Sequence, residues 1–73
     1  MFNKDDAVRF MQLNMLFYLA ERWQKPIPSV VEIDKKYDLL DVIKDGYESF
    51  HLTGNKGIAL EIEDYIHECG GVI

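Results

Sequence analysis

The sequence contains one cysteine, two prolines and no lysine or arginine after Lys56. The single thiol, Cys69, cannot close an intramolecular disulfide, and no zinc-binding spacing surrounds it, so the fold must rest on apolar packing. The longest apolar-rich run, residues 10–20, is interrupted by two polar residues and is too short to cross a bilayer. Met1–Lys25 lacks the cationic start and cleavage site of a secretory signal. These absences predict a cytoplasmic, reducing setting without membrane contact.

The basic residues are too dispersed for a nucleic-acid surface. Residues 1–56 hold nine acidic and eight basic side chains, whereas residues 57–73 hold four acidic side chains and no basic one, for a net charge of −5. Phosphate binding requires clustered lysine or arginine. The adjacent pair Lys35 and Lys36 is flanked by aspartates. Direct DNA or RNA binding is therefore disfavoured.

The apolar content is too high for a disordered chain, at 48% of the 73 residues. This length allows one domain at most, and we predict a single helical domain over residues 1–73. Apolar residues recur mostly at helical spacing. The spacing predicts an all-α fold, a small compact bundle of four helices at about residues 5–24, 30–37, 39–52 and 56–69.

Local signals set the expected helix boundaries. Asn3 is expected to cap the first helix, and Ser29, with a glutamate three residues on, has the spacing of a capping box for the second. The third helix is expected to continue through Gly46 at a cost of roughly 1 kcal/mol. Gly54 is expected to end it in a left-handed conformation. Asn55 is then expected to cap the last helix.

The first helix is apolar around most of its circumference, although a surface helix normally shows one apolar stripe. Either the other helices wrap it closely or part of it forms an interface. We favour the interface, occupied by a second copy in a dimer or by a partner protein. The candidate interface residues are Met11, Met15, Tyr18 and Trp23.

The last helix separates an apolar face from an acidic stripe. The apolar face contains Ile58, Ile62, Tyr65, Ile66 and Cys69. The acidic stripe, defined as Glu61, Asp64 and Glu68, has no lysine or arginine four residues away, and like charges at this spacing destabilise a helix. The stripe serves solubility or awaits a basic partner.

Tyr47 and His51 lie one helical turn apart, a spacing that acid–base chemistry can use. A histidine at a helix C-terminus is also stabilised by the helix dipole and can bond a turn carbonyl through a ring nitrogen. No nucleophile with an orienting third group lies nearby in the sequence. We therefore favour the structural interpretation and expect no catalytic residue, metal or cofactor.

The stretch YESFHLTGNKGIALEIEDYI, residues 47–66, resembles the tail pattern of a family of short bacterial proteins, domain-of-unknown-function family 3791. The residues that fit are Tyr47, His51, Gly54, Ile58, Ile62 and Tyr65, whereas Phe50 and Leu52 depart from the pattern. SVVEIDKKYDLLDVI resembles the middle segment of the family, and FMQLNMLFYLAERWQ resembles its first helix.

The resemblance implies no established activity. Genes of this family often lie beside genes for proteins with an ADP-ribosyltransferase-like domain, which implies a toxin–antitoxin or toxin–immunity pairing. The small size, the acidic stripe and the absence of a catalytic constellation predict a small protein-interaction module rather than an enzyme, and the resemblance implies a toxin as its protein partner. Two alternatives stay open: a ligand binder or enzyme that uses Tyr47 and His51, and a phage-type acidic inhibitor.

Overall fold

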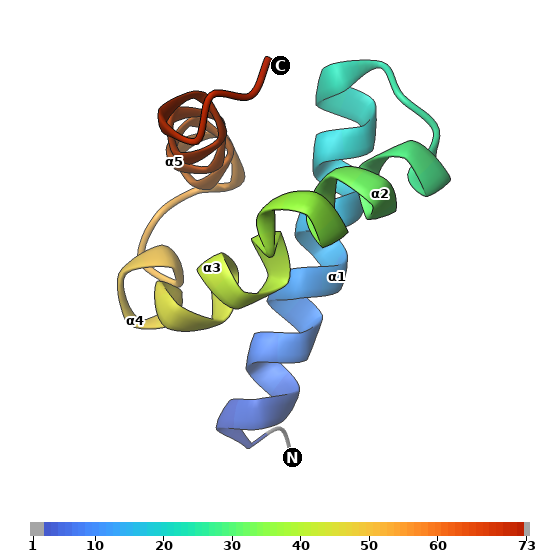
Figure 1. The fold of residues 1–73 in the computed structure, drawn as a ribbon. Helices are drawn as coiled ribbons and strands as arrows, with labels where there is room; N and C mark the ends of the chain where they lie inside the picture. Colours follow the sequence, from blue (N-terminus) through green and yellow to red (C-terminus); the bar gives the residue numbers. More distant parts are fainter. Residues whose placement is uncertain (1–2, 73) are drawn as a thin grey trace.

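The first helix, α1 (Lys4–Trp23), is the longest element of the computed structural model, which describes residues 3–72 (Figure 1). Its predicted cap is confirmed, because the Asp6 amide donates to Asn3 Oδ1 at 2.8 Å. Two aspartates occupy the first turn, where the helix dipole favours anions. The helix ends one residue earlier than predicted, since Gln24 adopts a left-handed conformation with φ 55° and ψ 45°.

Gln24 is stabilised in that conformation by hydrogen bonds of the last turn. The Gln24 amide donates to the Glu21 carbonyl at 3.3 Å, and the Lys25 amide donates to the Ala20 carbonyl at 2.9 Å. This pattern is the Schellman motif, which usually has glycine in the left-handed position. The glutamine therefore carries a steric cost that glycine would avoid.

We expect Gln24→Gly to raise the free energy of unfolding by about 0.5–1 kcal/mol. The left-handed conformation costs an L-residue roughly 1–2 kcal/mol, and the larger unfolded-state entropy of glycine offsets part of the gain. Chemical denaturation followed by circular dichroism measures the change. Asn14→Gly, inside α1, is the control and should lower stability by a few tenths of a kcal/mol. A lower stability for Gln24→Gly would contradict the prediction.

The second helix, α2 (Ile27–Tyr37), begins three residues earlier than predicted. The predicted capping box is wrong: Ser29 lies inside the first turn, and its amide donates to the Pro26 carbonyl at 3.0 Å. Pro28 is the second residue of the helix, where a backbone amide would have no carbonyl to bond within the helix, so proline fits there without losing a hydrogen bond.

The segment predicted as one helix over residues 39–52 forms two, α3 (Leu39–Asp45) and α4 (Tyr47–Phe50). The predicted continuity through Gly46 is wrong, since this residue adopts φ −91° and ψ 4°. A Cβ atom at Gly46 would lie 2.6 Å from Cε2 of the Phe50 ring. The absence of a side chain therefore lets the Phe50 ring pack against the backbone at the break.

The last helix, α5 (Asn55–Glu68), lies within one residue of its predicted bounds. The predicted left-handed Gly54 is wrong, because it adopts φ −69° and ψ 163° and itself stands at the N-cap in place of Asn55. Gly70 does take a left-handed conformation, φ 84°, just after the helix. Cys69 is exposed rather than part of the apolar face, because it lies beyond the last helical residue.

The core forms where α1 packs against α2, α3 and α5 (Figure 1). The buried side chains of this cluster are Met15, Leu19, Ala20, Val30, Leu39, Ile43, Ile58, Ala59, Ile62 and Ile66. None of the described residues forms a strand, and the predicted all-α bundle is confirmed, with five helices in place of four. Within residues 3–72, no helix has the length and apolarity needed to cross a membrane.

Candidate interaction surface

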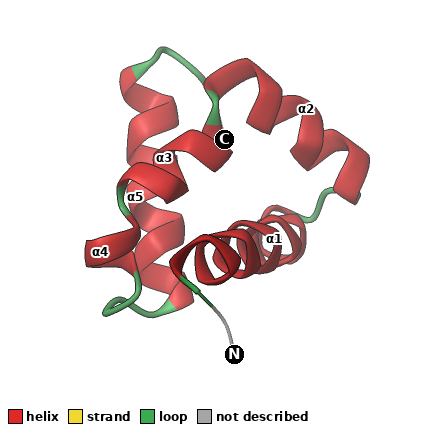
Figure 2. Ribbon diagram, turned by 90° about the horizontal axis from the view of Figure 1, so that it is seen from below, coloured by secondary structure: helices red, strands yellow, loops and turns green. Residues whose placement is uncertain are grey.

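Three large apolar side chains of α1 are more than half exposed. The exposed fractions are 64% for Phe10, 57% for Leu13 and 56% for Phe17. Spacings of three and four residues place these side chains on one face of the helix, which we call the α1 apolar stripe. Figure 2 views α1 nearly along its axis, with the other helices on one side and none on the opposite side.

Acidic residues stand at both ends of the α1 apolar stripe. Asp6 precedes Phe10 by four residues and Glu21 follows Phe17 by four, so both lie on the same face. Neither carboxylate forms an ion pair with any of residues 3–72. An exposed cation stands near each of them in the sequence, because Arg9 follows Asp6 by three residues and Lys25 follows Glu21 by four.

Two of the three basic residues of α1 pair with other helices. Lys4 Nζ pairs with Glu48 of α4 at 2.7 Å, and Arg22 Nε pairs with a carboxylate of α5 at the same distance. Arg9 lines a groove between α1 and α3. Arg9 also adjoins the stripe, because it precedes Leu13 by four residues and is exposed.

The predicted interface residues lie mainly on the covered side of α1. Met15 has no exposed surface and is a core residue. Its predicted place in the interface is therefore wrong. Met11, Tyr18 and Trp23 are partly buried against the same core. An apolar sequence pattern did not reveal which side of α1 would be covered, because that side depends on where the later helices pack.

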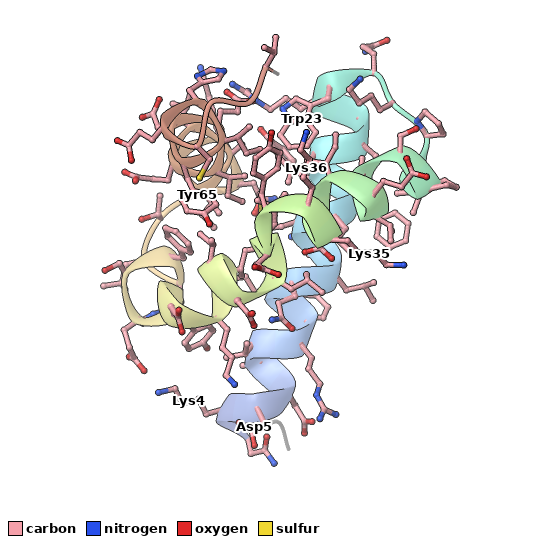
Figure 3. The ribbon with its side chains drawn as sticks, viewed as in Figure 1. Lys4, Asp5, Trp23, Lys35, Lys36 and Tyr65 are labelled. Carbon is pink, nitrogen blue, oxygen red and sulfur yellow. The ribbon has the colours of Figure 1, made fainter. Side chains whose placement is uncertain are left out.

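Arg22, Trp23 and Glu63 form a polar cluster between α1 and α5. Arg22 Nε and Trp23 Nε1 donate to Glu63 Oε2 at 2.7 and 2.8 Å, and Arg22 Nη2 donates to Oε1 at 3.3 Å. The Glu63 side chain is only 16% exposed. Figure 3 labels Trp23 near the end of α1. The hydrogen bond from Arg22 lowers the pKa of Glu63, with a further contribution from Trp23 and in spite of partial burial.

Sequence reasoning missed the role of Glu63, which it counted only among the acidic residues of the last helix. The available signal was Trp23, since a partly buried indole N–H requires an acceptor. Arg22 and Glu63 are 41 positions apart in the sequence. No local pattern links residues so far apart.

The acidic stripe of α5 lies on solvent, since Glu61, Asp64 and Glu68 are all exposed. The buried side of the helix carries Ile58, Ile62 and Ile66. None of the three stripe carboxylates forms an ion pair within the described part of the chain. The predicted arrangement of the stripe on a helix face is therefore present, and its role in partner binding stays a prediction.

Tyr47 and His51 stack, with ring centroids 5.3 Å apart and an interplanar angle of 19°. His51 Nδ1 lies 3.0 Å from the Tyr47 carbonyl oxygen, the turn contact that the sequence predicted. Both residues line a groove of about 440 Å³ whose other walls include Phe10 and Phe50. The groove adjoins the α1 apolar stripe, because Phe10 belongs to both.

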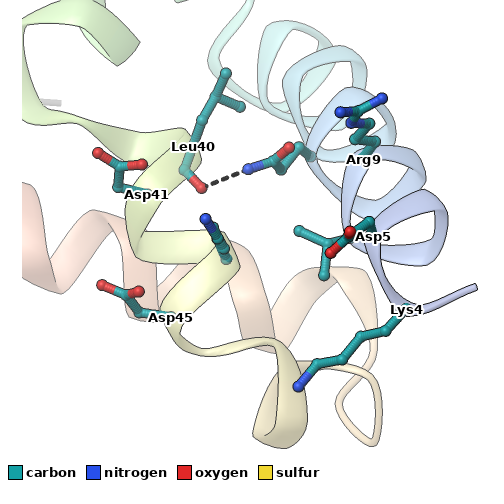
Figure 4. Close-up of a pocket in the computed structure, with 9 residues that line it drawn as sticks. Lys4, Asp5, Arg9, Leu40, Asp41 and Asp45 are labelled. Atoms are coloured by element: carbon teal, nitrogen blue, oxygen red, sulfur yellow. Dashed lines mark hydrogen bonds between the residues drawn. The ribbon is translucent and has the colours of Figure 1, made fainter.

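A second groove, of about 810 Å³, separates the first half of α1 from α3 (Figure 4). Gln12 Nε2 crosses it and donates to the Leu40 carbonyl at 2.7 Å. Its lining includes the cations Lys4, Arg9 and Lys44 and the anions Asp5, Asp41 and Asp45. These charges balance, so the groove favours neither an anionic nor a cationic ligand. Among residues 3–72, no three His, Cys, Asp or Glu side chains are grouped to hold a metal ion.

A family model described as a protein of unknown function (DUF3791) matches residues 10–69. The chain belongs to the DUF3791 family. This finding confirms the resemblance identified from the sequence. No curated protein and no solved structure matches the chain.

The residues matched to the DUF3791 family include the whole α1 apolar stripe, the Arg22–Glu63 pair and the acidic stripe of α5. Lys4 and Asp5, at the edge of the charged groove, lie outside the match. The family description names no activity, so a function for this member must be argued from its surfaces.

Proposed function

We propose that this DUF3791 protein is a small cytoplasmic protein-interaction module that binds its partner through the α1 apolar stripe. The observation that carries the proposal is the exposure of Leu13 and Phe17, each above one half, on a single helix face. Burial of a large apolar side chain contributes roughly 1.5–3 kcal/mol. Such a face is therefore more stable when another surface covers it.

The resemblance to a family encoded beside ADP-ribosyltransferase-like proteins supports a specific partner. We propose that the partner is such a toxin and that this chain is its antitoxin or immunity protein. A small helical module can block an enzyme by covering its surface, and that role requires no catalytic residue of its own. The proposal is compatible with the balanced charges of the larger groove and the structural contact of His51.

Co-purification with the product of the adjacent gene tests the proposal. An affinity-tagged chain is co-expressed with that product in three forms: wild type, Leu13→Gln/Phe17→Gln, and Leu52→Gln. Leu52 is the matched control because it is 82% exposed but lies outside the stripe. We expect the stripe variant to retain at most about one tenth of the partner that the wild-type chain retains. The control should retain the wild-type amount.

Circular dichroism of each purified variant verifies that the helices persist. The proposal is wrong if the wild-type chain retains no adjacent product. It is also wrong if the folded stripe variant retains as much of that product as the wild type does.

The acidic stripe of α5 supports a second, electrostatic contribution to the same complex. We expect Glu61→Lys/Asp64→Lys/Glu68→Lys to abolish the complex while leaving the fold intact, because all three side chains are exposed and unpaired within residues 3–72. The matched control is Glu32→Lys/Asp41→Lys/Asp45→Lys, which makes the same change of net charge elsewhere. Equal affinity of the two triple variants would remove the acidic stripe from the interface.

A further inference from the structure

Residues 47–53, which comprise α4 and the turn after it, contain no buried side chain and lie at the edge of the bundle (Figure 1). The chain is anchored on either side of them, because Ile43 of α3 has no exposed surface and Ile58 of α5 is only 2% exposed. A helix as short as α4 is not stable by itself in water. These seven residues therefore keep their structure only through contacts with the other helices.

The backbone hydrogen bonds of residues 47–53 close within the segment and at its boundary. The amides of Phe50, His51 and Thr53 donate to the carbonyls of Gly46, Tyr47 and Phe50 at 2.8, 2.9 and 2.9 Å. The Tyr47 and His51 rings stack on each other as well. Among residues 3–72, no backbone hydrogen bond joins the segment to another helix. The segment can therefore detach without breaking a backbone hydrogen bond of any other helix.

An exposed ion pair and one partly buried ring hold the segment against the other helices. Lys4 Nζ of α1 lies 2.7 Å from Glu48 Oε1, with 67% and 71% of the two side chains exposed. Ion pairs so exposed are weak. The Phe50 ring packs partly on the core and partly on Gly46, at the boundary of the segment itself. A segment with so little buried apolar contact opens at a low cost.

A glycine bounds the segment at each end. Gly46 separates α3 from α4, and nothing beyond its chain neighbours lies within 4 Å of the position that a Cβ atom of Gly54 would occupy. A glycine backbone has more accessible conformations than that of any other residue. These two positions can therefore act as hinges.

The segment walls the groove of about 440 Å³ beside α1. Tyr47, Phe50 and His51 line the groove, and so does Ile58 of α5. Because Ile58 is only 2% exposed, its side chain lies at the floor of the groove. Displacement of the segment would remove one wall and expose that side chain.

We propose that residues 47–53 form a flap that opens as a unit while the rest of the bundle stays folded. The two glycines are its hinges, and the Lys4–Glu48 pair favours the closed state. Opening deepens the groove into an apolar recess with Ile58 at its floor. The motion belongs to the isolated chain and requires no partner, so it is independent of the proposed function.

Amide hydrogen exchange of the wild-type protein, followed by NMR at several low urea concentrations, tests the proposal. The hydrogen-bonded amides of Phe50, His51 and Thr53 should exchange through one common opening. Their protection factors should be at least about 100-fold below those of Leu19 and Ile62 in the core. Their exchange should depend only weakly on urea, because opening of the flap exposes little surface.

Thiol labelling measures whether opening uncovers Ile58. Ile58→Cys and Ile62→Cys are each made in a Cys69→Ser background, since Cys69 is exposed. Ile62 is the matched control because it is fully buried one turn further along α5 and is not among the residues that line the groove. A thiol at position 58 should react at least about tenfold faster than one at position 62, with a weaker dependence on urea.

Charge reversal tests the role of the ion pair. Lys4→Glu places two carboxylates together and should speed exchange of the flap amides by about two- to fivefold. Lys4→Glu/Glu48→Lys should restore the wild-type rate. Lys44→Glu is the matched control, because it makes the same change of net charge on α3 and should leave the rate unchanged.

Three results would overturn the flap: amides of residues 47–53 that exchange only with global unfolding, the same amides without any protection, or a thiol at position 58 that reacts no faster than one at position 62. If Ile58→Cys does not fold, amide exchange of the wild-type protein decides alone. A rate that Lys4→Glu leaves unchanged would overturn the role of the ion pair in closure.

Discussion

Met15→Ala is expected to lower the free energy of unfolding by about 2–5 kcal/mol, the range for methionine-to-alanine changes in protein cores. Met15 has no exposed surface and lies in the cluster that joins α1 to the other helices. Domains of this size have a total stability of only about 4–11 kcal/mol. A large fraction of the stability should therefore disappear, and urea denaturation followed by circular dichroism measures it.

Leu13→Ala is the control, since it removes a similar side chain two positions away on the same helix. Leu13 is 57% exposed, and exposed substitutions usually change stability by less than about 0.5 kcal/mol. Comparable losses for the two variants would show that Leu13 is covered in the isolated protein. That result would contradict both the burial pattern of α1 and the proposed exposed stripe.

Glu63→Ala is expected to lower the free energy of unfolding by about 1–2 kcal/mol, which corresponds to a fall in Tm of roughly 4–16 °C for a domain of this size. The substitution removes the acceptor of three hydrogen bonds from Arg22 and Trp23. Differential scanning calorimetry at pH 7 measures the change. Glu61→Ala, on the exposed acidic stripe, should change Tm little, and an equal loss there would contradict the prediction.

The Glu63 contribution should depend on pH with a defined sign. The hydrogen bond from Arg22 lowers the pKa of the Glu63 carboxyl in the folded state, so folding favours the ionised form. The stability that this provides is complete above the unfolded pKa of about 4.3 and is lost as the pH falls through the lower folded pKa. The stability difference between wild type and Glu63→Ala should therefore narrow from pH 5 toward pH 2.

The exposed ion pair with Lys4 lowers the pKa of Glu48 as well. This pair is present in both the wild type and Glu63→Ala. Its effect cancels in the difference. If the stability difference between wild type and Glu63→Ala stays constant or widens as the pH falls, Glu63 acts through packing rather than through its charge.

The sequence by itself determined the features that depend on neighbouring residues. The Asn3 cap follows from a side chain that reaches an amide three positions on, and the end of α1 lies just before Lys25-Pro26, within one residue of its predicted position. The all-α class follows from apolar spacing over several turns. Local chemistry also misled at Ser29, because Pro26 at the N-cap and Pro28 in the first turn are as compatible with a helix start as a serine cap is.

Only the tertiary structure decided which apolar residues of α1 became core and which became surface. Met15 and Phe17 are both apolar and two positions apart, yet one is fully buried and the other is 56% exposed. The same holds for Glu63 and Glu61, since only Glu63 meets Arg22 and Trp23 from a distant helix. The break at Gly46 likewise accompanies the packing of Phe50 against it. Burial depends on contacts between segments far apart in the chain, and those contacts form only when the helices pack together.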